Sequence, residues 1–472
     1  MLFDYDVLIV GAGPAGCAAA FDLAHAGRRV LLLDKRSFPR HKACACGLTR
    51  KTLKALRYSV APILERECRD VVLQEAGPAF LSGRRTADKG CEVRVRLRNP
   101  FCAMAVRERF DAFCLDQTLA HGQHKPELRK IEGIVALREL PTHIELDLTL
   151  LGGTTQTLRA PTLIGADGSN GQTRRLAAGI AAFHSQSSDL SSRSTAQESA
   201  LPPIPQDASI PEATAATLPA EPDWYARGFA LEATVPYAAL PTILPGGDAR
   251  LDLVFDFSPI AGGYGWLFPK GDHINIGVGG FVPQKPGADA VNSPESAATG
   301  APGMQYEAVT RTLLAEYTRK KLGVDLATLQ SAHVSGQHLG LGGHAYTPQG
   351  RLLLTGDAAG LVDPLTGEGI HSAIVSGQAA ASAILEVLPS TAQATTRAAA
   401  EAVHLAAAYA RHLAPLRETL TFSQRAARSF YREPERGFKV MRTPLLRSLV
   451  LKTYADGLPT TKLLTRLARR VA

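Results

Sequence analysis

The sequence predicts an α/β protein with three parts: a parallel sheet covered by helices, a second domain built on an antiparallel sheet, and a helical C-terminal region. Three observations predict this. Residues 5–10, 14–26 and 28–34 follow one another as a buried strand, a helix and a second strand. Within 223–329, runs such as ALEATVP, ARLDLVFDF and HINIGVGGFV have the alternation of antiparallel strands. Near the end the chain is helical in pattern and basic.

Length and composition agree with a multidomain globular protein. A chain of 472 residues exceeds the size of one ordinary domain, and 45% apolar with 20% charged residues is typical of globular proteins. No uninterrupted apolar run approaches the roughly 20 residues of a membrane-spanning helix. The first residues enter a strand pattern without the basic start of a signal peptide. We therefore expect a cytoplasmic protein.

The domain boundaries follow from where the patterns change. The expected parts are 1–180 with 330–390 for a discontinuous first domain, 223–329 for the antiparallel-sheet domain, and 391–472 for the helical, basic C-terminal region. Strands of the second domain are expected to be interleaved with the first around 70–110.

Two segments read as insertions. Residues 181–222 are rich in Ser, Ala and Pro with few large apolar groups, and 283–303 is a shorter stretch of the same kind. Such sequences bury too little surface to offset the entropy of ordering. We expect the first to be a disordered insertion in a surface loop.

The first strand and helix are joined by GAGPAG at 11–16, a GxGxxG pattern. In this turn Gly11 allows the tight bend, Gly13 lets the backbone approach a pyrophosphate, and Gly16 lets the helix pack on the strand. Asp34 ends the second strand about 20 residues on, where a carboxylate recognises ribose hydroxyls. A glycine-rich turn without a ligand is the alternative, but the context favours a Rossmann-like dinucleotide site.

Two later motifs indicate which dinucleotide binds. LIGADG at 163–168 ends a strand with an Asp-Gly pair, RLLLTGDAAG at 351–360 ends one with a Gly-Asp pair, and DPLTGEGI at 363–370 leads into a helix. A carboxylate at a strand end can hold polyol hydroxyls, and the helix start can offer N–H groups to an electron-rich ring. Sites spread from Gly11 to Ile370 suit an extended FAD, since NAD needs only the first unit.

These motifs resemble a known family. GAGPAG, GADG and GDAAG, in this order, resemble the flavoprotein superfamily that includes p-hydroxybenzoate hydroxylase. GDAAGLVDPLTGEGI, with Gly360 where aromatic hydroxylases carry His, is similar to the geranylgeranyl reductase family. KACACGLT at 42–49 resembles that family's Lys-x-Cys-Gly-x-Gly-Leu segment, and YGWLFPK at 264–270 matches its YxWxFPK motif. The matches span 6–385, apart from the insertions.

The resemblance implies FAD contacts at Ala15, Asp34, Cys44, Ala45, Gly47, Arg107, Asp357, Gly369 and Ile370. The predicted cofactor-binding set also includes residues of the motifs themselves: Gly11, Gly13, Pro14, Gly16, Lys35, Asp167, Gly356 and Gly367. Arg107 begins the family's Arg-x-x-Phe-Asp, where the guanidinium can pair with the pyrophosphate. Three residues depart from the family pattern. Asp34 stands in place of Glu, Gly171 in place of Ser, and Ala45 in place of Gly, so the reach to ribose is shorter and the flavin pocket narrower.

The two cysteines of KACACGLT could be metal ligands, a disulfide or cofactor contacts. All seven cysteines lie in the first quarter of the chain, without a second Cys or His cluster that would complete a metal site. A disulfide between Cys44 and Cys46 would close a strained ring in a reducing compartment. The resemblance implies that Cys44 lies against the isoalloxazine. It is either a catalytic thiol and possible proton donor or a buried space-filler, and Cys46 fills space.

Tyr264, Trp266 and Phe268 alternate along a predicted strand and so share one face. They are either core residues or the wall of a tunnel for an isoprenoid chain. The resemblance favours the tunnel, with Pro269 completing the expected substrate-binding set. His371, at the start of the last motif's helix, reads as a helix-surface or pocket residue and not as a base.

The function implied is an FAD-dependent reductase that saturates double bonds of a geranylgeranyl or related polyprenyl substrate. The reduced flavin delivers hydride, and an acid that the sequence does not identify, or water, supplies the proton. NADPH or ferredoxin is the expected electron donor, although no second nicotinamide fingerprint is present. A flavin-dependent monooxygenase or halogenase of the same fold is the alternative, and Gly360 with the 42–49 and 264–270 segments favours the reductase. A flavin-binding scaffold without activity is a weaker reading.

The net charge of +8 is concentrated in the C-terminal tail. Residues 411–472 hold 14 Lys and Arg against four acidic residues, a net of +10, so the rest of the chain is slightly acidic and is not a nucleic-acid binder by charge. Within 462–471, leucines and a valine recur at helical spacing beside basic residues. This predicts either a helix lying on an anionic membrane or a solvated helix packed on its own domain.

Overall fold

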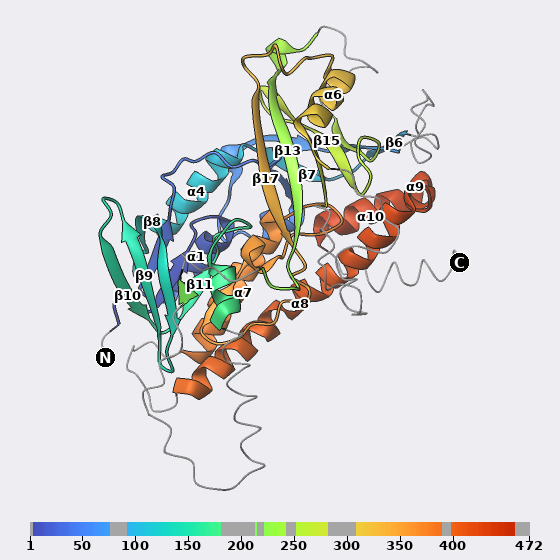
Figure 1. The fold of residues 1–472 in the computed structure, drawn as a ribbon. Helices are drawn as coiled ribbons and strands as arrows, with labels where there is room; N and C mark the ends of the chain where they lie inside the picture. Colours follow the sequence, from blue (N-terminus) through green and yellow to red (C-terminus); the bar gives the residue numbers. More distant parts are fainter. Residues whose placement is uncertain are drawn as a thin grey trace, which may run out of the picture.

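The computed structural model describes residues 3–75, 92–180, 213–214, 221–241, 252–281, 308–388 and 398–457. The described residues form three sheets with their helices, and the C-terminal helices run along one side of the two larger sheets (Figure 1). The predicted α/β class with a helical C-terminal region is confirmed. The insertion expected at 181–222, apart from 213–214 and 221–222, the insertion at 283–303 and the basic stretch 462–471 lie outside the described residues.

The first sheet contains the predicted strand–helix–strand unit. In sheet order its strands are β10 (Thr155–Ala160), β9 (Ile144–Leu150), β8 (Glu127–Glu139), β2 (Val30–Asp34), β1 (Val7–Val10), β11 (Leu163–Gly165) and β18 (Leu352–Leu354), with β12 (Ala213–Thr214) paired to β8. The pairs from β8 through β18 are parallel, whereas β8, β9 and β10 form an antiparallel meander. The carboxyl ends of the parallel strands therefore meet at one edge, where ligands of such sheets bind.

Helices cover this sheet and fix the edge. α1 (Pro14–His25) packs against α7 (Ile370–Val387), and α7 packs in turn against α8 (Ala398–Arg432). The crossing of α1 and α7 is close, since a Cβ built at Gly377 would lie 2.2 Å from the Ala15 carbonyl oxygen. Among the described helices, α7 is long and apolar enough to span a membrane, but 61% of it is buried inside the protein. It is therefore a core helix.

The second sheet has the order β17 (His333–Leu341), β13 (Ala226–Pro236), β16 (His273–Phe281), β15 (Gly263–Pro269), β14 (Leu253–Asp256), β5 (Asp70–Gln74) and β6 (Glu92–Arg96). It is antiparallel except for the β14–β5 pair. α6 (Arg311–Leu322) covers one face through Leu314 and Tyr317. The boundary expected at residue 330 is wrong by one strand, because β17 pairs with β13 and the chain rejoins the first sheet only at β18.

Smaller elements join the two sheets. A third sheet has the order β3 (Gly47–Thr49), β7 (Cys102–Ala105) and β4 (Leu64–Cys68). The remaining helices are α2 (Arg50–Ala55), η1 (Ala61–Ile63), α4 (Arg107–Ala120), η3 (Tyr237–Ala239) and η5 (Gly356–Ala359). α4 packs on α1. β3 begins directly after the cysteine pair, so this sheet sets where that segment lies.

The C-terminal region ends in α9 (Pro434–Arg442) and α10 (Pro444–Asp456), which follow α8 in a chain of contacts and return to α2 (Figure 1). Phe438 and Leu451 are buried against strands of the second sheet. These helices are thus packed on the body of the protein and close one side of the space between the two sheets.

Candidate functional site

A cavity of about 1450 Å³ lies between the edge of the first sheet, one face of the second sheet and helices α8 to α10. Most residues predicted from the sequence line it: Gly11, Gly13, Pro14, Ala15, Asp34, Lys35, Cys44, Ala45, Gly47, Arg107, Asp167, Gly356, Asp357, Gly367, Gly369, Ile370, Tyr264, Trp266 and Phe268. Gly16 and Pro269 are not on its wall. The structure therefore brings segments from the whole chain to one site.

The glycine-rich turn separates structural from ligand-facing positions. Gly11 has φ +105°, and a Cβ there would lie 2.3 Å from the Ala166 carbonyl oxygen; one at Gly16 would lie 1.9 Å from the Gly11 carbonyl oxygen. At Gly13 the nearest atom to such a Cβ is Nη2 of Arg40, at 3.4 Å. No side chain caps α1, so its first N–H groups are available to an anion at Gly13.

Three basic side chains surround this turn. Nε of Arg107, which is buried, donates to Oδ1 of Asp111 at 2.7 Å, and Nη2 of Arg40 lies 3.3 Å from the other Asp111 oxygen. Burial, followed by repulsion from Arg107, lowers the pKa of Lys42. Sequence reasoning identified Arg107 but missed the other two, although the basic run at 40–42 was a signal. Arg40 and Arg107 share the single carboxylate of Asp111, which leaves positive charge for a diphosphate.

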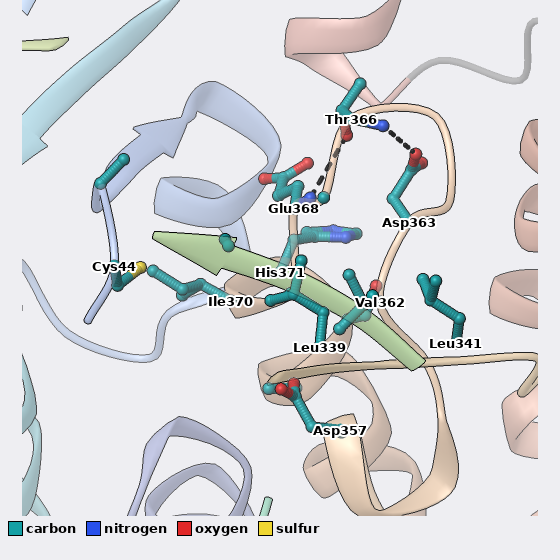
Figure 2. Close-up of a pocket in the computed structure, with 18 of the residues that line it drawn as sticks. Cys44, Leu339, Leu341, Asp357, Val362, Asp363, Thr366, Glu368, Ile370 and His371 are labelled. Carbon is teal, nitrogen blue, oxygen red and sulfur yellow. Dashed lines mark hydrogen bonds between the residues drawn. The ribbon is translucent and has the colours of Figure 1, made fainter. Parts of the chain in front are cut away.

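Two of the predicted carboxylates are placed to meet hydroxyl groups. Asp34, at the end of β2, accepts from the Ala12 N–H at 2.9 Å and remains partly exposed on the cavity wall. Asp357 also lines the cavity (Figure 2). Within the described part of the chain its carboxylate accepts no hydrogen bond, whereas its backbone oxygen accepts one from the Tyr225 hydroxyl at 3.1 Å. The Asp357 side chain is therefore free to bind a polyol.

Asp167 has a local role. Its Oδ2 accepts from the N–H groups of Gln172 and Thr173 at 2.7 and 3.0 Å, so it caps the helical segment that starts at 173. A Cβ at Gly171 would lie 2.0 Å from the Asp167 carboxyl carbon, which explains the glycine at that position. Asp167 lines the cavity, but this carboxylate is used to shape the loop.

The start of α7 forms another part of the wall. Gly369 precedes the helix, Ile370 is its first residue, and no side chain caps it. Asp363 fixes the preceding loop by accepting from the Thr366 N–H at 3.0 Å (Figure 2). The Cys44 side chain faces Ile370 in Figure 2. The helix start and the cysteine segment therefore face each other on the cavity wall.

Cys44 is fixed by backbone hydrogen bonds. Its N–H donates to Oε1 of Glu232 at 2.9 Å, and its Sγ accepts from the Cys46 N–H at 3.3 Å. Cys46 is buried and has φ +49°. A hydrogen bond from the Cys46 side chain, together with the charge of Arg107, holds the pKa of the Cys44 thiol well below its usual range despite burial. The thiol of Cys44 is therefore more acidic than an ordinary cysteine thiol.

Lys270 ties this segment to the second sheet, and sequence reasoning did not assign it a role. The side chain is buried, and its Nζ donates to the carbonyl oxygens of Ala45 and of Ala105, the latter at 2.7 Å. It is the last residue of YGWLFPK, which was a signal. The lysine holds the end of β15 against the cysteine segment.

Sequence reasoning also missed Glu232. It is buried in β13, lines the cavity, and carries the carboxylate that accepts from Cys44. Burial, followed by the negative charge of Cys44, raises its pKa to about 7, although hydrogen bonds from the Cys44 N–H and Asn275 act in the opposite direction. A glutamate within the apolar run ALEATVP was the available signal.

The aromatic residues of β15 form a continuous wall. Ring centroids of Tyr264 and Trp266 are 5.9 Å apart, and those of Trp266 and Phe268 are 6.5 Å apart. The Trp266 indole lies over Gly277, where a Cβ would be 2.1 Å from the ring. Pro269 was wrongly included in the substrate set, because alternate residues of a strand point to opposite faces and Pro269 is absent from the cavity wall.

The C-terminal helices complete the enclosure. Tyr454 of α10 donates to Oε2 of Glu368 at 2.7 Å, and Lys51 forms an ion pair with the same oxygen at 2.7 Å. Phe430 of α8 packs edge-on against Phe257 with centroids 4.8 Å apart. His371 lines the cavity as expected, and burial lowers its pKa to about 4, so it is neutral at pH 7.

Comparisons with known proteins agree with this arrangement. The FAD binding domain family matches residues 4–217. A menaquinone reductase of Mycobacterium tuberculosis is 28% identical over 391 residues, which cover 80% of this chain and 75% of that protein. A geranylgeranyl diphosphate reductase of Rhodobacter capsulatus is 26% identical over 390 residues, which cover 82% and 76%.

Solved structures share the fold. A geranylgeranyl bacteriochlorophyll reductase-like protein of Thermoplasma acidophilum aligns with a TM-score of 0.55 and 17% identity over 98% of both chains. A variant of a flavin-dependent brominase aligns with a TM-score of 0.59 and 15% identity over 99% of both chains. At these identities the likeness concerns the fold and does not distinguish the two activities.

Proposed function

Because this chain belongs to the geranylgeranyl reductase family of FAD-dependent oxidoreductases, we propose that it saturates carbon–carbon double bonds of a geranylgeranyl or related polyprenyl substrate. The observation that carries the proposal is the aromatic wall of the cavity. The volume of the cavity, about 1450 Å³, exceeds the range of about 300–1,000 Å³ that is usual for one small-molecule pocket. There is room for a long apolar chain beside the cofactor.

FAD is the cofactor, and the residues present fit it. The backbone at Gly13 leaves the space that a pyrophosphate needs, and the buried Nε of Arg40 has no hydrogen-bond partner within the described residues. Asp357 has a free carboxylate for the ribityl hydroxyls, and Cys44 and the start of α7 at Ile370 would flank the ring. When bound and reduced, FAD supplies a hydride.

The protein's own contribution is to bind, orient and dehydrate the substrate. Tyr264, Trp266 and Phe268 offer a stacked apolar surface that suits a polyene. The C-terminal helices place Phe430 and Tyr454 on the cavity wall, where these side chains limit the access of water. An alkene held against this wall near Cys44 would react in a dry, fixed orientation.

The direct test is anaerobic turnover of the FAD-loaded protein. Geranylgeranyl diphosphate, prenylated quinones and chlorophyll precursors would be offered with NADPH or reduced ferredoxin as electron donor, and products analysed by mass spectrometry. We expect a mass gain of two hydrogens for each bond saturated. If no polyprenyl compound gains mass and an aromatic substrate instead stimulates oxygen consumption, the monooxygenase or halogenase alternative is correct.

Cys44→Ser is expected to lower the alkene-reduction rate per bound flavin about ten- to hundredfold while FAD content changes little. The substitution replaces a thiol of lowered pKa beside the expected ring position with a hydroxyl that keeps its proton, and an interaction with a charged group is worth about 1.5–3 kcal/mol. Cys114→Ser is the control, since that thiol is buried on α4 away from the cavity. An unaltered rate in the Cys44 variant would make this thiol a packing residue.

We also propose that the protein is cytoplasmic and docks at a membrane surface, where polyprenyl compounds partition. The corner between α9 and α10 exposes Leu445, whose relative exposure is 85%, and Val440 beside Arg442 and Arg447. Apolar side chains framed by basic residues favour an anionic lipid interface. The basic segment at 458–472 adds to the same end of the chain.

Flotation with anionic vesicles tests this proposal. The full chain is expected to float with the vesicles, and a chain ending at Gly457 or carrying Leu445→Asp is expected to float less. Neutral vesicles are the control for the charge contribution, since each basic residue near anionic lipid adds about 1 kcal/mol. If the full chain stays in the pellet fraction, or all three forms float equally, this docking mode is wrong.

A further inference from the structure

Glu232 lies on the cavity wall in line with the aromatic residues. Gly228, Ala230 and Glu232 are alternate residues of β13, and all three line the cavity. Across the sheet Glu232 pairs with Gly277, which pairs with Trp266, so the three residues form one row. Because the indole of Trp266 covers Gly277, nothing bulky separates the carboxyl from the aromatic wall.

Hydrogen bonds hold this carboxyl at the cysteine end of the cavity. Its Oε1 accepts from the Cys44 N–H at 2.9 Å, and the Asn275 side chain lies close enough to the carboxyl to lower its pKa. Asn275 in turn accepts from Nε1 of Trp266 at 2.8 Å. Glu232 is therefore fixed between the segment that flanks the flavin position and the wall that would hold the substrate.

We propose that Glu232 donates the proton that completes reduction of the alkene. The inference rests on the function proposed above. Two electrons and one hydrogen arrive at one alkene carbon as hydride from the reduced cofactor. The O–H bond of Glu232 breaks while a C–H bond forms at the other carbon, and the resulting carboxylate regains a proton from solvent. The alkene thus gains two hydrogens, and the cofactor is oxidised by two electrons.

Other ionisable groups on the wall are less suited to this step. A hydrogen bond from the Cys46 side chain and the charge of Arg107 lower the pKa of the Cys44 thiol well below its usual range, so Cys44 holds its proton less firmly than an ordinary thiol. The Tyr264 hydroxyl donates to the Thr366 carbonyl oxygen, and burial raises its pKa well above neutrality. Lys51 holds the pKa of Glu368 below its usual value although burial opposes this, and His371 is neutral with a pKa of about 4.

Glu232 differs from these groups because opposing influences leave its pKa near neutrality. Burial and the charge of Cys44 raise its pKa to about 7, and the nearby Lys270 and the hydrogen bonds from Cys44 and Asn275 limit the rise. A general acid works best when its pKa is near the working pH. The protonated form donates, so a rate limited by this step falls as pH rises through about 7.

Glu232→Gln removes the proton but keeps the shape of the side chain. We expect FAD content and bleaching of the flavin by dithionite to be unchanged, and alkene saturation per bound flavin to fall about 10²- to 10⁴-fold. The alkaline fall in rate that we expect for the wild type should be absent in this variant. Glu139→Gln is the matched control: Glu139 is buried, its pKa is also raised by burial, and it accepts from the Arg351 N–H away from the cavity. That variant should keep the wild-type rate and profile.

An infrared pH titration of the resting FAD-loaded protein tests the proton without turnover. The wild type should show a protonated-carboxyl band that disappears as pH rises through about 7, is absent in Glu232→Gln and persists in Glu139→Gln. Should Glu232→Gln fail to fold, Glu232→Asp keeps an acid on a shorter arm and should retain the alkaline fall.

Wild-type rates in Glu232→Gln, or a missing band at pH 6, would overturn the assignment. If the wild type saturates no polyprenyl compound, the proposed function fails on its own account. The titration then still decides whether Glu232 holds a proton at neutral pH.

Discussion

Gly13→Val is expected to abolish FAD binding, so that the variant purifies colourless whereas the wild type is yellow. Gly13 has φ −81°, which valine adopts readily, and the nearest atom to a Cβ there is Nη2 of Arg40 at 3.4 Å. The substitution therefore leaves the fold of the empty protein intact. Its methyl groups occupy the space that the pyrophosphate needs and block the N–H groups at the start of α1. Losing even one charge-assisted hydrogen bond costs about 1.5–3 kcal/mol, and several are lost together.

Gly11→Val provides the contrast. Its φ of +105° and a Cβ 2.3 Å from the Ala166 carbonyl oxygen make any side chain incompatible with the fold. We expect that variant to lose its cooperative thermal transition by circular dichroism, whereas Gly13→Val keeps it and loses only the flavin absorbance. Full yellow colour in Gly13→Val would show that the pyrophosphate lies elsewhere.

The parts of the site that could be predicted from the sequence are those fixed by local geometry. The local geometry of the turn at 11–16 explains its glycines, and the residues around Gly369 determine where α7 begins. The alternation of Tyr264 and Trp266 places both on the cavity face, and the same rule applied to Pro269 would have removed it from the substrate set.

What the sequence could not provide depends on contacts between distant segments. Glu232 meets Cys44 across 188 residues, and Lys270 meets Ala45 across 225. No periodicity records which strand lies beside the cysteine segment. The placement of β17 has the same origin, since only its register with β13 assigns it to the second sheet. Asp167 shows a different limit, because a motif identifies a carboxylate near the cavity without showing that it caps a helix.

Lys270→Met is expected to destabilise the protein by about 2–6 kcal/mol. The lysine is buried, and its Nζ donates to two carbonyl oxygens, those of Ala45 and Ala105. Methionine keeps most of the length of the side chain but cannot donate, so the buried Ala105 carbonyl and the partly buried Ala45 carbonyl lose this partner. Each unsatisfied buried group costs about 1–3 kcal/mol. Against a total stability of about 5–15 kcal/mol this is a large loss, visible as a lower urea midpoint.

The same substitution should loosen the cysteine segment and weaken FAD binding, since Lys270 fixes Ala45 from the side of the second sheet. Cys44 is then expected to react faster with iodoacetamide in the variant than in the wild type, because the cysteine segment is held less firmly and the thiol becomes more accessible. Lys54→Met is the control: its side chain is 68% exposed and its ion pair with Asp456 spans 3.6 Å at the surface. If Lys270→Met matches that control in urea midpoint, flavin content and thiol reactivity, the two carbonyl contacts do not hold the cysteine segment, and the rigidity of that segment must come from the backbone bonds to Glu232 and within β3–β7 alone.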